Sequence, residues 1–145
     1  MTNKPLSDSL VYLMIQTCKA QRALAEKLWC EIGLHVGQDM ILRQLWADDG
    51  LTQSELAGRL CIQPATTTKM LQRMEQAQLI RRLGDSQDQR VSRVYLTEQG
   101  RALLKPYEEV MNRLEQHLTE GLNLEERLLL RRLLMQVRDN LTKQL

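Results

Sequence analysis

Two consecutive segments between residues 51 and 77 carry apolar residues at three- and four-residue spacing. This spacing predicts a short helix in each segment. The first helix begins at a capping box, in which Thr52 and Glu55 each bond the other's backbone amide. The second begins at Pro64, because a proline in the first turn of a helix leaves no bond unmade. The inward positions of the second helix are Thr67, Met70, Leu71 and Met74. Two short helices joined by a three-residue turn are typical of a helix-turn-helix.

A β-hairpin is predicted directly after these helices. Residues 79–83 and 91–96 mix apolar and polar positions over the length of a strand, and residues 84–90 between them contain no apolar side chain. A helix-turn-helix followed by such a hairpin is a winged helix, with the hairpin as its wing. The expected fold is therefore mainly α, with one small β-hairpin.

Four further helices are predicted around the winged helix from the same periodicity. They cover residues 8–31, 38–47, 98–118 and the chain from residue 124 onward. N-cap residues precede three of them, at Ser7, Thr97 and Asn123. Pro106 lies inside the third, where it should bend the helix or remove one hydrogen bond.

The first and last helices carry more apolar surface than a core of this size needs. In the last helix this surface consists of Leu128, Leu129, Leu130, Leu133, Leu134, Val137 and Leu141. The simplest partner for it is a second copy of the chain, in a homodimer whose terminal helices interdigitate. We therefore expect a helical dimerisation region over residues 1–32 and 98–145, and a winged helix-turn-helix over residues 33–97, in one intertwined domain.

Basic residues concentrate on the winged helix. Residues 66–93 contain six basic and three acidic side chains, whereas the whole chain has a net charge of only +2. Such a local excess fits the phosphates of DNA, although the helix face alone could equally be a solvated surface. Candidates for major-groove contacts on the second helix are Ala65, Thr66, Thr68, Lys69, Gln72 and Arg73. Candidates for phosphate or minor-groove contacts on the hairpin are Arg81, Arg82, Arg93 and, at its tip, Arg90.

Composition limits the other classes of function. With 43% hydrophobic and 26% charged residues, no apolar run of bilayer length and no signal peptide, a soluble cytoplasmic protein is expected. No nucleotide-binding loop or catalytic motif is present, so we expect neither an enzyme nor a cofactor. The three cysteines, Cys18, Cys30 and Cys61, lack the spacing of a disulfide framework or a zinc site.

Three segments resemble the MarR family of bacterial transcriptional regulators: residues 51–57, residues 66–75 and residues 88–100. The last contains Asp88-x-Arg90 and a strand ending in Leu-Thr-x-x-Gly. The resemblance implies a homodimeric repressor on a pseudo-palindromic operator, with recognition helices about one helical turn (~34 Å) apart. It also implies that Asp88 braces Arg90 or a neighbouring arginine, and that a small, often aromatic, acid is the effector.

Two positions depart from the family pattern. The family usually has glycine after each helix of the helix-turn-helix, where this chain has Cys61 and Gln78. Both positions commonly require a left-handed backbone, which costs a non-glycine residue about 1 kcal/mol.

Other functions remain open within this fold. Some family members sense oxidants through a first-helix cysteine, for which Cys18 is the candidate, although a buried cysteine on an apolar stripe is usually inert. A winged helix can also serve as a protein-interaction module that does not bind DNA. A wing of that kind does not need the arginines that this hairpin carries. Zinc sensing has the weakest support, because the candidate ligands Cys30, Glu31, His35 and His117 have no fixed spacing.

Overall fold

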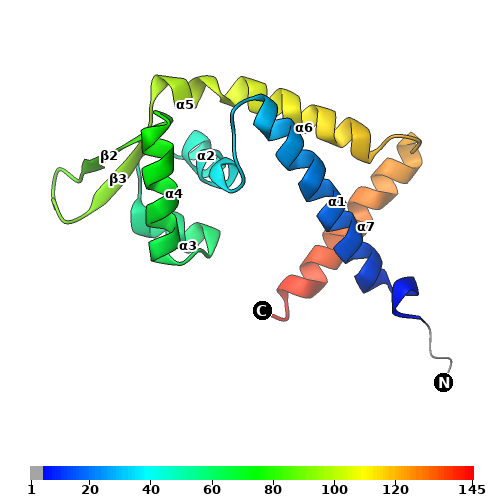
Figure 1. Ribbon diagram of the computed structural model, residues 1–145. Coiled ribbons are helices and arrows are strands. Elements are labelled where there is room, and N and C mark those ends of the chain that lie inside the picture. Colours follow the sequence, from blue (N-terminus) through cyan, green and yellow to red (C-terminus); the bar gives the residue numbers. More distant parts are fainter. Residues whose placement is uncertain (1–4) are drawn as a thin grey trace. The chain divides into compact units, whose positions relative to one another are not determined.

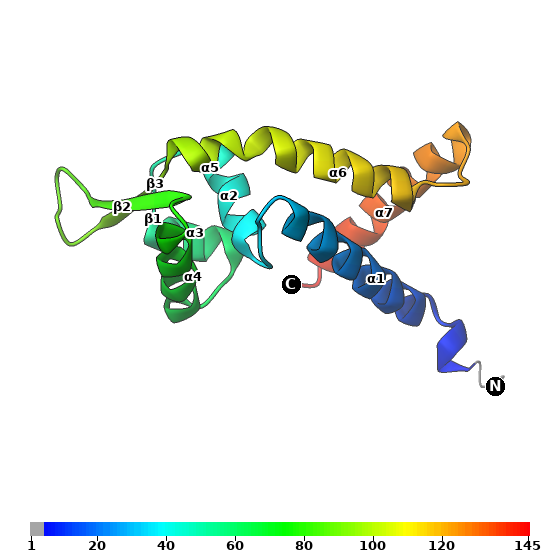
Figure 2. The same cartoon turned by 45° about the horizontal axis from the view of Figure 1, so that its top comes forward.

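The computed structural model describes residues 5–145, which are mainly helical with one small sheet (Figures 1 and 2). The helices are η1 (Leu6–Asp8, a 3-10 turn), α1 (Leu10–Glu31), α2 (Gln38–Ala47), α3 (Gln53–Leu60), α4 (Pro64–Gln76), α5 (Glu98–Ala102), α6 (Leu104–Leu118) and α7 (Leu124–Thr142). The strands are β1 (Leu51–Thr52), β2 (Ile80–Gly84) and β3 (Ser92–Leu96). The chain divides into two compact units, Met1–Met111 and Asn112–Leu145.

The helix-turn-helix of the first unit forms as predicted. Thr52 Oγ1 accepts from the amide of Glu55 at 3.1 Å, and Glu55 Oε2 accepts from the amide of Thr52 at 2.7 Å, which completes the capping box of α3. Pro64 is the first residue of α4. In both views the β2–β3 hairpin projects beyond α4 as a wing (Figures 1 and 2).

The sheet has a third strand that the sequence did not predict. β1 pairs with β3, with Leu51 opposite Val94, so the strand order is β1-β3-β2. A strand of two residues is too short for alternation to be visible in the sequence. Both strands of the hairpin begin and end within one residue of their predicted limits.

The start of the first helix differs from the prediction. Its N-cap is Ser9, not Ser7, because Leu6–Asp8 forms a separate 3-10 turn. The hydroxyl of Ser9 accepts from the amide of Tyr12 at 3.0 Å. The predicted end of the helix, near Glu31, is correct.

The predicted helix over residues 98–118 is two helices, α5 and α6, that meet at Leu103. Pro106 explains the break, because it has no amide to donate to the carbonyl of Ala102 and its ring crowds that carbonyl. Thr97 caps α5 as predicted, with its hydroxyl accepting from the amide of Gly100 at 3.0 Å.

The core of the first unit lies among α2, α3, α4 and the sheet. Its buried members are Leu34, Ile41, Leu42, Leu45, Leu51, Leu56, Leu71, Met74, Leu79, Ile80, Val94, Leu96 and Tyr107. Thr67 is also fully buried, and its hydroxyl donates to the carbonyl of Gln63 at 3.2 Å. The core is therefore aliphatic, apart from Tyr107.

Cys61 and Gln78 have the left-handed backbone expected for the two departures from the family pattern. Their φ angles are 51° and 60°, and no other non-glycine among residues 5–145 has a positive φ. After α4 the amide of Gln78 donates to Glu75 at 2.9 Å and that of Leu79 donates to Met74 at 3.0 Å, which is the bonding of a Schellman motif.

The second unit contains the end of α6 and all of α7. Gly121 has a φ of 79° and ends the turn after α6. Asn123, the predicted N-cap of α7, forms a capping box with Glu126, with both bonds at 2.9 Å. Among the helices of residues 5–145, none has the combined length and apolarity that a bilayer crossing requires.

Candidate nucleic-acid surface and ligand pocket

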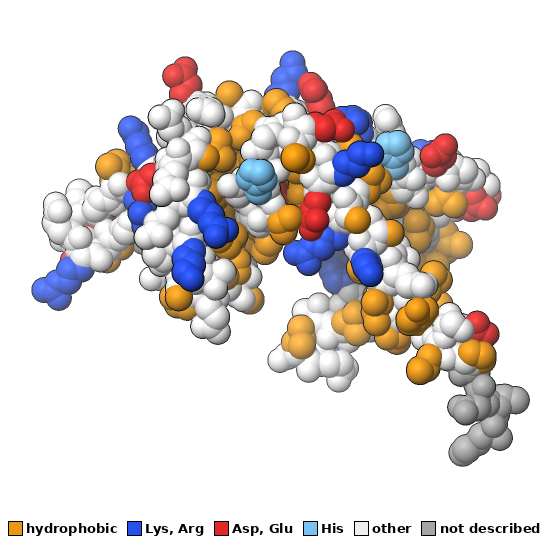
Figure 3. All heavy atoms as spheres, viewed as in Figure 1, with side chains coloured by type: hydrophobic (Ala, Val, Ile, Leu, Met, Phe, Trp, Pro, Cys, Tyr) orange, Lys and Arg blue, Asp and Glu red, His pale blue; other side chains and the backbone are white. Residues whose placement is uncertain are grey.

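The outer face of α4 is the first candidate surface. Five of its six predicted groove-facing residues are exposed, namely Ala65, Thr66, Lys69, Gln72 and Arg73. Figure 3 shows basic side chains over this helix and at the outer end of the wing. The polar residues of α4 share its outer face because the opposite face of the helix carries Leu71 and Met74 into the core.

Thr68, the sixth predicted groove residue, has partners inside the motif. Its hydroxyl accepts from Gln53 Nε2 at 2.6 Å and donates to the carbonyl of Pro64 at 3.0 Å. The side chain therefore ties the start of α3 to the start of α4, which leaves little of its bonding capacity for a base.

Two of the four hairpin arginines are held in ion pairs. Arg82 contacts Glu75 through Nη2 and Nε, at 2.8 and 3.0 Å, and this hydrogen bonding lowers the pKa of Glu75. Arg93 pairs with Asp85 through Nε and donates from Nη1 to the carbonyl of Gly50 at 2.9 Å. Both arginines thus stabilise the wing. From the sequence alone, this role could not be distinguished from direct contact with DNA.

The wing tip differs in detail from the family pattern. Asp88 Oδ1 accepts from the backbone amide of Arg90 at 3.0 Å and makes no ion pair within residues 5–145. The carboxylate that pairs with a wing arginine is Asp85, three residues earlier. In the same described range, Lys69, Arg73, Arg81 and Arg90 have no ion-pair partner, so their charges are available to another molecule.

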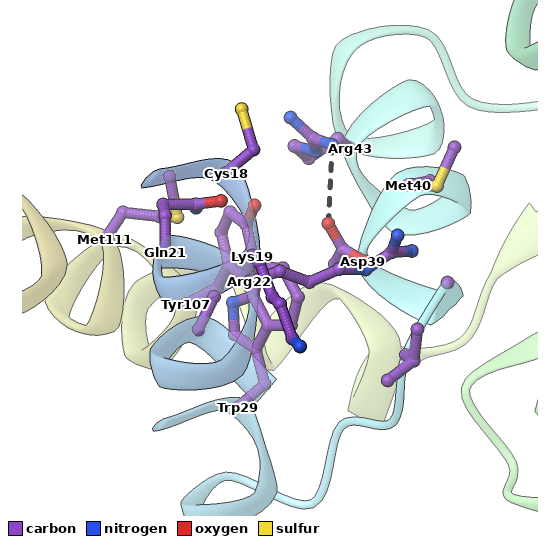
Figure 4. Close-up of a pocket in the computed structure, with 13 residues that line it drawn as sticks. Cys18, Lys19, Gln21, Arg22, Trp29, Asp39, Met40, Arg43, Tyr107 and Met111 are labelled. Atoms are coloured by element: carbon purple, nitrogen blue, oxygen red, sulfur yellow. Dashed lines mark ion pairs between the residues drawn. The ribbon is translucent and has the colours of Figure 1, made fainter. Parts of the chain in front are cut away.

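A pocket of about 560 Å³ lies in the first unit, away from the wing (Figure 4). α1, the start of α2 and α6 supply most of its wall. Its lining residues are Cys18, Lys19, Gln21, Arg22, Ala25, Trp29, Val36, Gly37, Asp39, Met40, Arg43, Tyr107 and Met111.

Two aromatic side chains with polar atoms, Trp29 and Tyr107, line one part of the pocket. The rings of Trp29 and Tyr107 are stacked, with centroids 6.4 Å apart and planes 15° apart, and Trp46 packs on Tyr107 at 5.0 Å. Trp29 Nε1 and the Tyr107 hydroxyl are buried, and neither has a hydrogen-bond partner among residues 5–145. Burial raises the pKa of Tyr107. Both atoms keep their hydrogen-bonding capacity for another molecule.

The charges around the pocket are mainly positive. Lys19, Arg22 and Arg43 line it, and Asp39 is the one acidic lining residue. The Asp39 side chain is 5% exposed and pairs with Arg43 Nη2 at 3.3 Å (Figure 4, dashed line). Its burial raises the pKa of Asp39, against the opposing effect of Arg43. No pattern in the sequence indicated this site, because its walls come from three separated helices.

Cys18 lies in the wall of the pocket and is exposed, which corrects the expectation of a buried cysteine. That expectation failed because only Ala25 and Leu28 of this helix are buried. Cys30 and Cys61 are also exposed. No group of three or more potential metal ligands occurs within the described residues.

Comparison with known proteins places this architecture in a family. The model of the MarR family matches residues 34–92. The organic hydroperoxide resistance transcriptional regulator of Bacillus subtilis (strain 168) is 32% identical over 100 residues, 69% of this chain and 67% of that protein. The HTH-type transcriptional regulator TtmR of Methylorubrum extorquens (strain PA1) is 36% identical over 66 residues, 46% of this chain but only 34% of that relative.

A solved structure extends the comparison to nearly the whole chain. A variant of MarR from E. coli, complexed with operator DNA, aligns with 88% of this chain and 92% of its own. The TM-score is 0.77 and the sequence identity is 25%. On these similarities and the winged helix, the chain belongs to the MarR family and is a DNA-binding transcriptional regulator rather than an enzyme.

Proposed function

We propose that this regulator binds a pseudo-palindromic operator as a homodimer and represses transcription until a small acid releases it. The observation that carries the DNA part is the set of four cations without ion-pair partners on α4 and the wing, within the described chain. Cations that no carboxylate neutralises are available to phosphate, and their loss should weaken binding in a salt-dependent manner.

The proposal gives these residues different roles. Thr66, Gln72 and Arg73 select bases in the major groove, because their side chains can bond base edges. Lys69 and Arg81 contact phosphates, and Arg90 enters the minor groove. Thr68, Arg82, Asp88 and Arg93 contribute by holding α4 and the wing in shape.

Selection of bound fragments from genomic DNA, followed by footprinting, tests this assignment. We expect two related half-sites about one helical turn apart. Gln72→Ala should change base preference at symmetric positions, whereas Arg81→Ala should weaken all sequences about equally. If no fragment is enriched, the protein-interaction module is the better description.

The homodimer is supported by apolar side chains that the described chain leaves exposed. On α1 they include Leu10, Val11, Leu13 and Ile15, and on α7 they include Leu128, Leu129, Leu133, Leu134 and Leu141. Surfaces of this kind commonly pack against a partner. We assign dimerisation to residues 1–32 and 98–145 and DNA binding to residues 33–97.

Sedimentation velocity tests the dimer. Leu133→Glu should shift the protein to monomer, because it would bury an unpaired charge in the interface. Gln136→Glu adds the same charge to an exposed polar position of the same helix and should leave the dimer intact. A dimer that tolerates both substitutions would contradict the proposed interface.

A small planar aromatic acid is the effector that fits the pocket best. Its ring would stack on Trp29 and Tyr107, and an oxygen acceptor would satisfy the unpaired indole N–H. Its carboxylate would be attracted by Lys19 and by Arg22, whose pair with Glu26 on the same helix is solvent-exposed and 3.5 Å long. Arg43 is held more firmly, by the buried Asp39.

Calorimetric titration with benzoate and with cyclohexanecarboxylate separates ring stacking from charge alone. We expect the aromatic acid to bind more tightly and to lower operator affinity. Arg22→Gln should weaken its binding by about tenfold, whereas Arg138→Gln, on α7, should not. Equal or absent binding of both acids would reject this effector class.

An oxidant sensor is the second candidate function, because Cys18 is exposed in the wall of the same pocket. The name of the Bacillus subtilis relative, a regulator of organic hydroperoxide resistance, favours the same reading. A hydroperoxide would oxidise the thiol to a sulfenic acid and be reduced to an alcohol. Cys18→Ser should then remain on DNA under cumene hydroperoxide; normal release of this variant would reject the candidate.

A further inference from the structure

We propose that Asp49 is a positioning residue for DNA binding, which sets the base of the wing on the end of α2. Asp49 lies in the corner that follows α2, next to Asp48 and Gly50. Its Oδ1 atom accepts from the amides of Leu96 and Gly50, at 2.9 and 3.1 Å. Its Oδ2 atom accepts from Arg101 Nη2 on α5 at 2.7 Å. One carboxylate therefore contacts the last residue of β3 and the helix that follows it.

The Asp49 carboxylate extends the sheet at the point where β1 ends. Leu51 is opposite Val94 in the β1–β3 pair, so the same register places Asp49 opposite Leu96. At this position the Asp49 side chain accepts the hydrogen bond that a backbone carbonyl would accept if β1 were longer. The bond from the Leu96 amide thus fixes the end of β3 at the base of the wing, together with the backbone bonds from Gly50 to Val94 and from Thr97 to Leu79.

The neighbouring Gly50 holds the wing from its other side. Its carbonyl accepts from Arg93 Nη1 at 2.9 Å, and the same arginine pairs with Asp85 in the wing loop. Gly50 has a φ of 79°, and a Cβ there would lie 2.8 Å from the ring of Tyr95. The corner is thus closely packed against β3, so a change at Asp49 should be felt along the wing.

α2 is itself tied to the segment beyond the wing. Trp46 Nε1 donates to the carbonyl of Gly100 at 3.0 Å, and Asp48 pairs with Arg59 of α3 at 2.9 Å. Trp46 and Asp48 hold α5 and α3 independently of Asp49, so loss of the Asp49 carboxylate should act mainly at the end of β3, at the base of the wing. The inference rests on the proposed minor-groove role of Arg90, through which Asp49 would act.

A double-mutant cycle in the full-length protein tests the inference. Affinity is measured on a duplex selected by the wild-type protein, well below the melting temperature of every variant. Asp49→Ala should lose about tenfold in affinity in the wild-type background and much less in the Arg90→Ala background. Asp49→Asn keeps the Oδ1 acceptor and should stay within about threefold of wild type. Asp139→Ala, which removes an exposed aspartate from another Arg pair, is the matched control.

The outcomes separate this inference from the proposed wing role. If Arg90→Ala has no effect, the wing role and the inference both fail. If Arg90→Ala weakens binding but Asp49→Ala costs the same in both backgrounds, only the inference fails, because Asp49 would then be merely structural. If Asp49→Ala does not fold, Asp49→Glu, which keeps the charge and displaces the carboxylate, supplies the same cycle.

Discussion

Replacing Gln78 with glycine should increase the free energy of unfolding. Gln78 occupies the left-handed position of the Schellman motif after α4, with a φ of 60°. A side chain there crowds the following carbonyl, whereas glycine has no Cβ to do so. The two bonds of the motif come from the backbone amides of Gln78 and Leu79, so they survive the substitution.

The expected gain follows from two opposing contributions. Relief of the left-handed conformation is worth about 1–2 kcal/mol, and the greater freedom of glycine in the unfolded chain costs about 0.5–1 kcal/mol. The net stabilisation is therefore about 0.5–1 kcal/mol. With an unfolding entropy of roughly 0.3 kcal/mol/K for a chain of this length, the melting temperature should rise by about 2–3 °C.

Urea unfolding followed by circular dichroism measures this difference, at one fixed protein concentration because dimerisation would affect the midpoint. Gln76→Gly is the matched control: it is the same exchange two residues earlier, at the last position of α4. It should destabilise by up to about 1 kcal/mol, the usual cost of glycine in a helix. Loss of stability in Gln78→Gly, or the same sign for both variants, would refute the backbone argument.

Three other substitutions probe the wing and its base. Arg90→Ala should weaken operator binding, reduce the slope of log K against log salt by about 1 and leave the dimer intact; an unchanged affinity in anisotropy titrations would contradict the wing assignment. Because Arg82 lowers the pKa of Glu75, their pairing contributes stability above the unfolded pKa of Glu75 and loses it as pH falls through the lower folded value. Arg82→Gln should therefore flatten the acid side of a stability–pH curve from urea unfolding, and an unaltered curve would argue against this linkage. Gly100→Ala should cost about 3 kcal/mol of unfolding free energy, since its Cβ would lie 2.1 Å from the carbonyl of Leu79; near-normal stability would show that the segment relaxes easily.

Local chemistry explains why much of the fold could be predicted. The capping boxes at Thr52 and Asn123 each join two residues that are three apart in the chain. Residues this close in sequence are also close in space, so the motif can be recognised without the fold. The left-handed turns at Cys61 and Gln78 were expected from the family pattern, which has glycine at both helix ends, where that backbone is common. Such features depend on few distant contacts.

The features that the sequence did not predict depend on distant residues. The ion pair of Arg93 with Asp85 and the bond of Thr68 to Gln53 join segments whose pairing no periodicity encodes. The pocket and the burial of Asp39 arise only when α1, α2 and α6 are assembled. A long basic side chain can pair either with DNA or with a carboxylate of the same chain. Only the three-dimensional structure distinguishes these two partners.

Fluorescence anisotropy across a salt series tests the central claim most directly. The wild-type protein is titrated with a duplex from upstream of its own gene and with a scrambled duplex of the same composition. We predict tight binding to the first, with log K falling steeply and linearly against log salt, and much weaker binding to the second. Equal and weak binding to both duplexes, together with no enriched fragment in the genomic selection, would contradict sequence-specific DNA recognition by α4 and the wing.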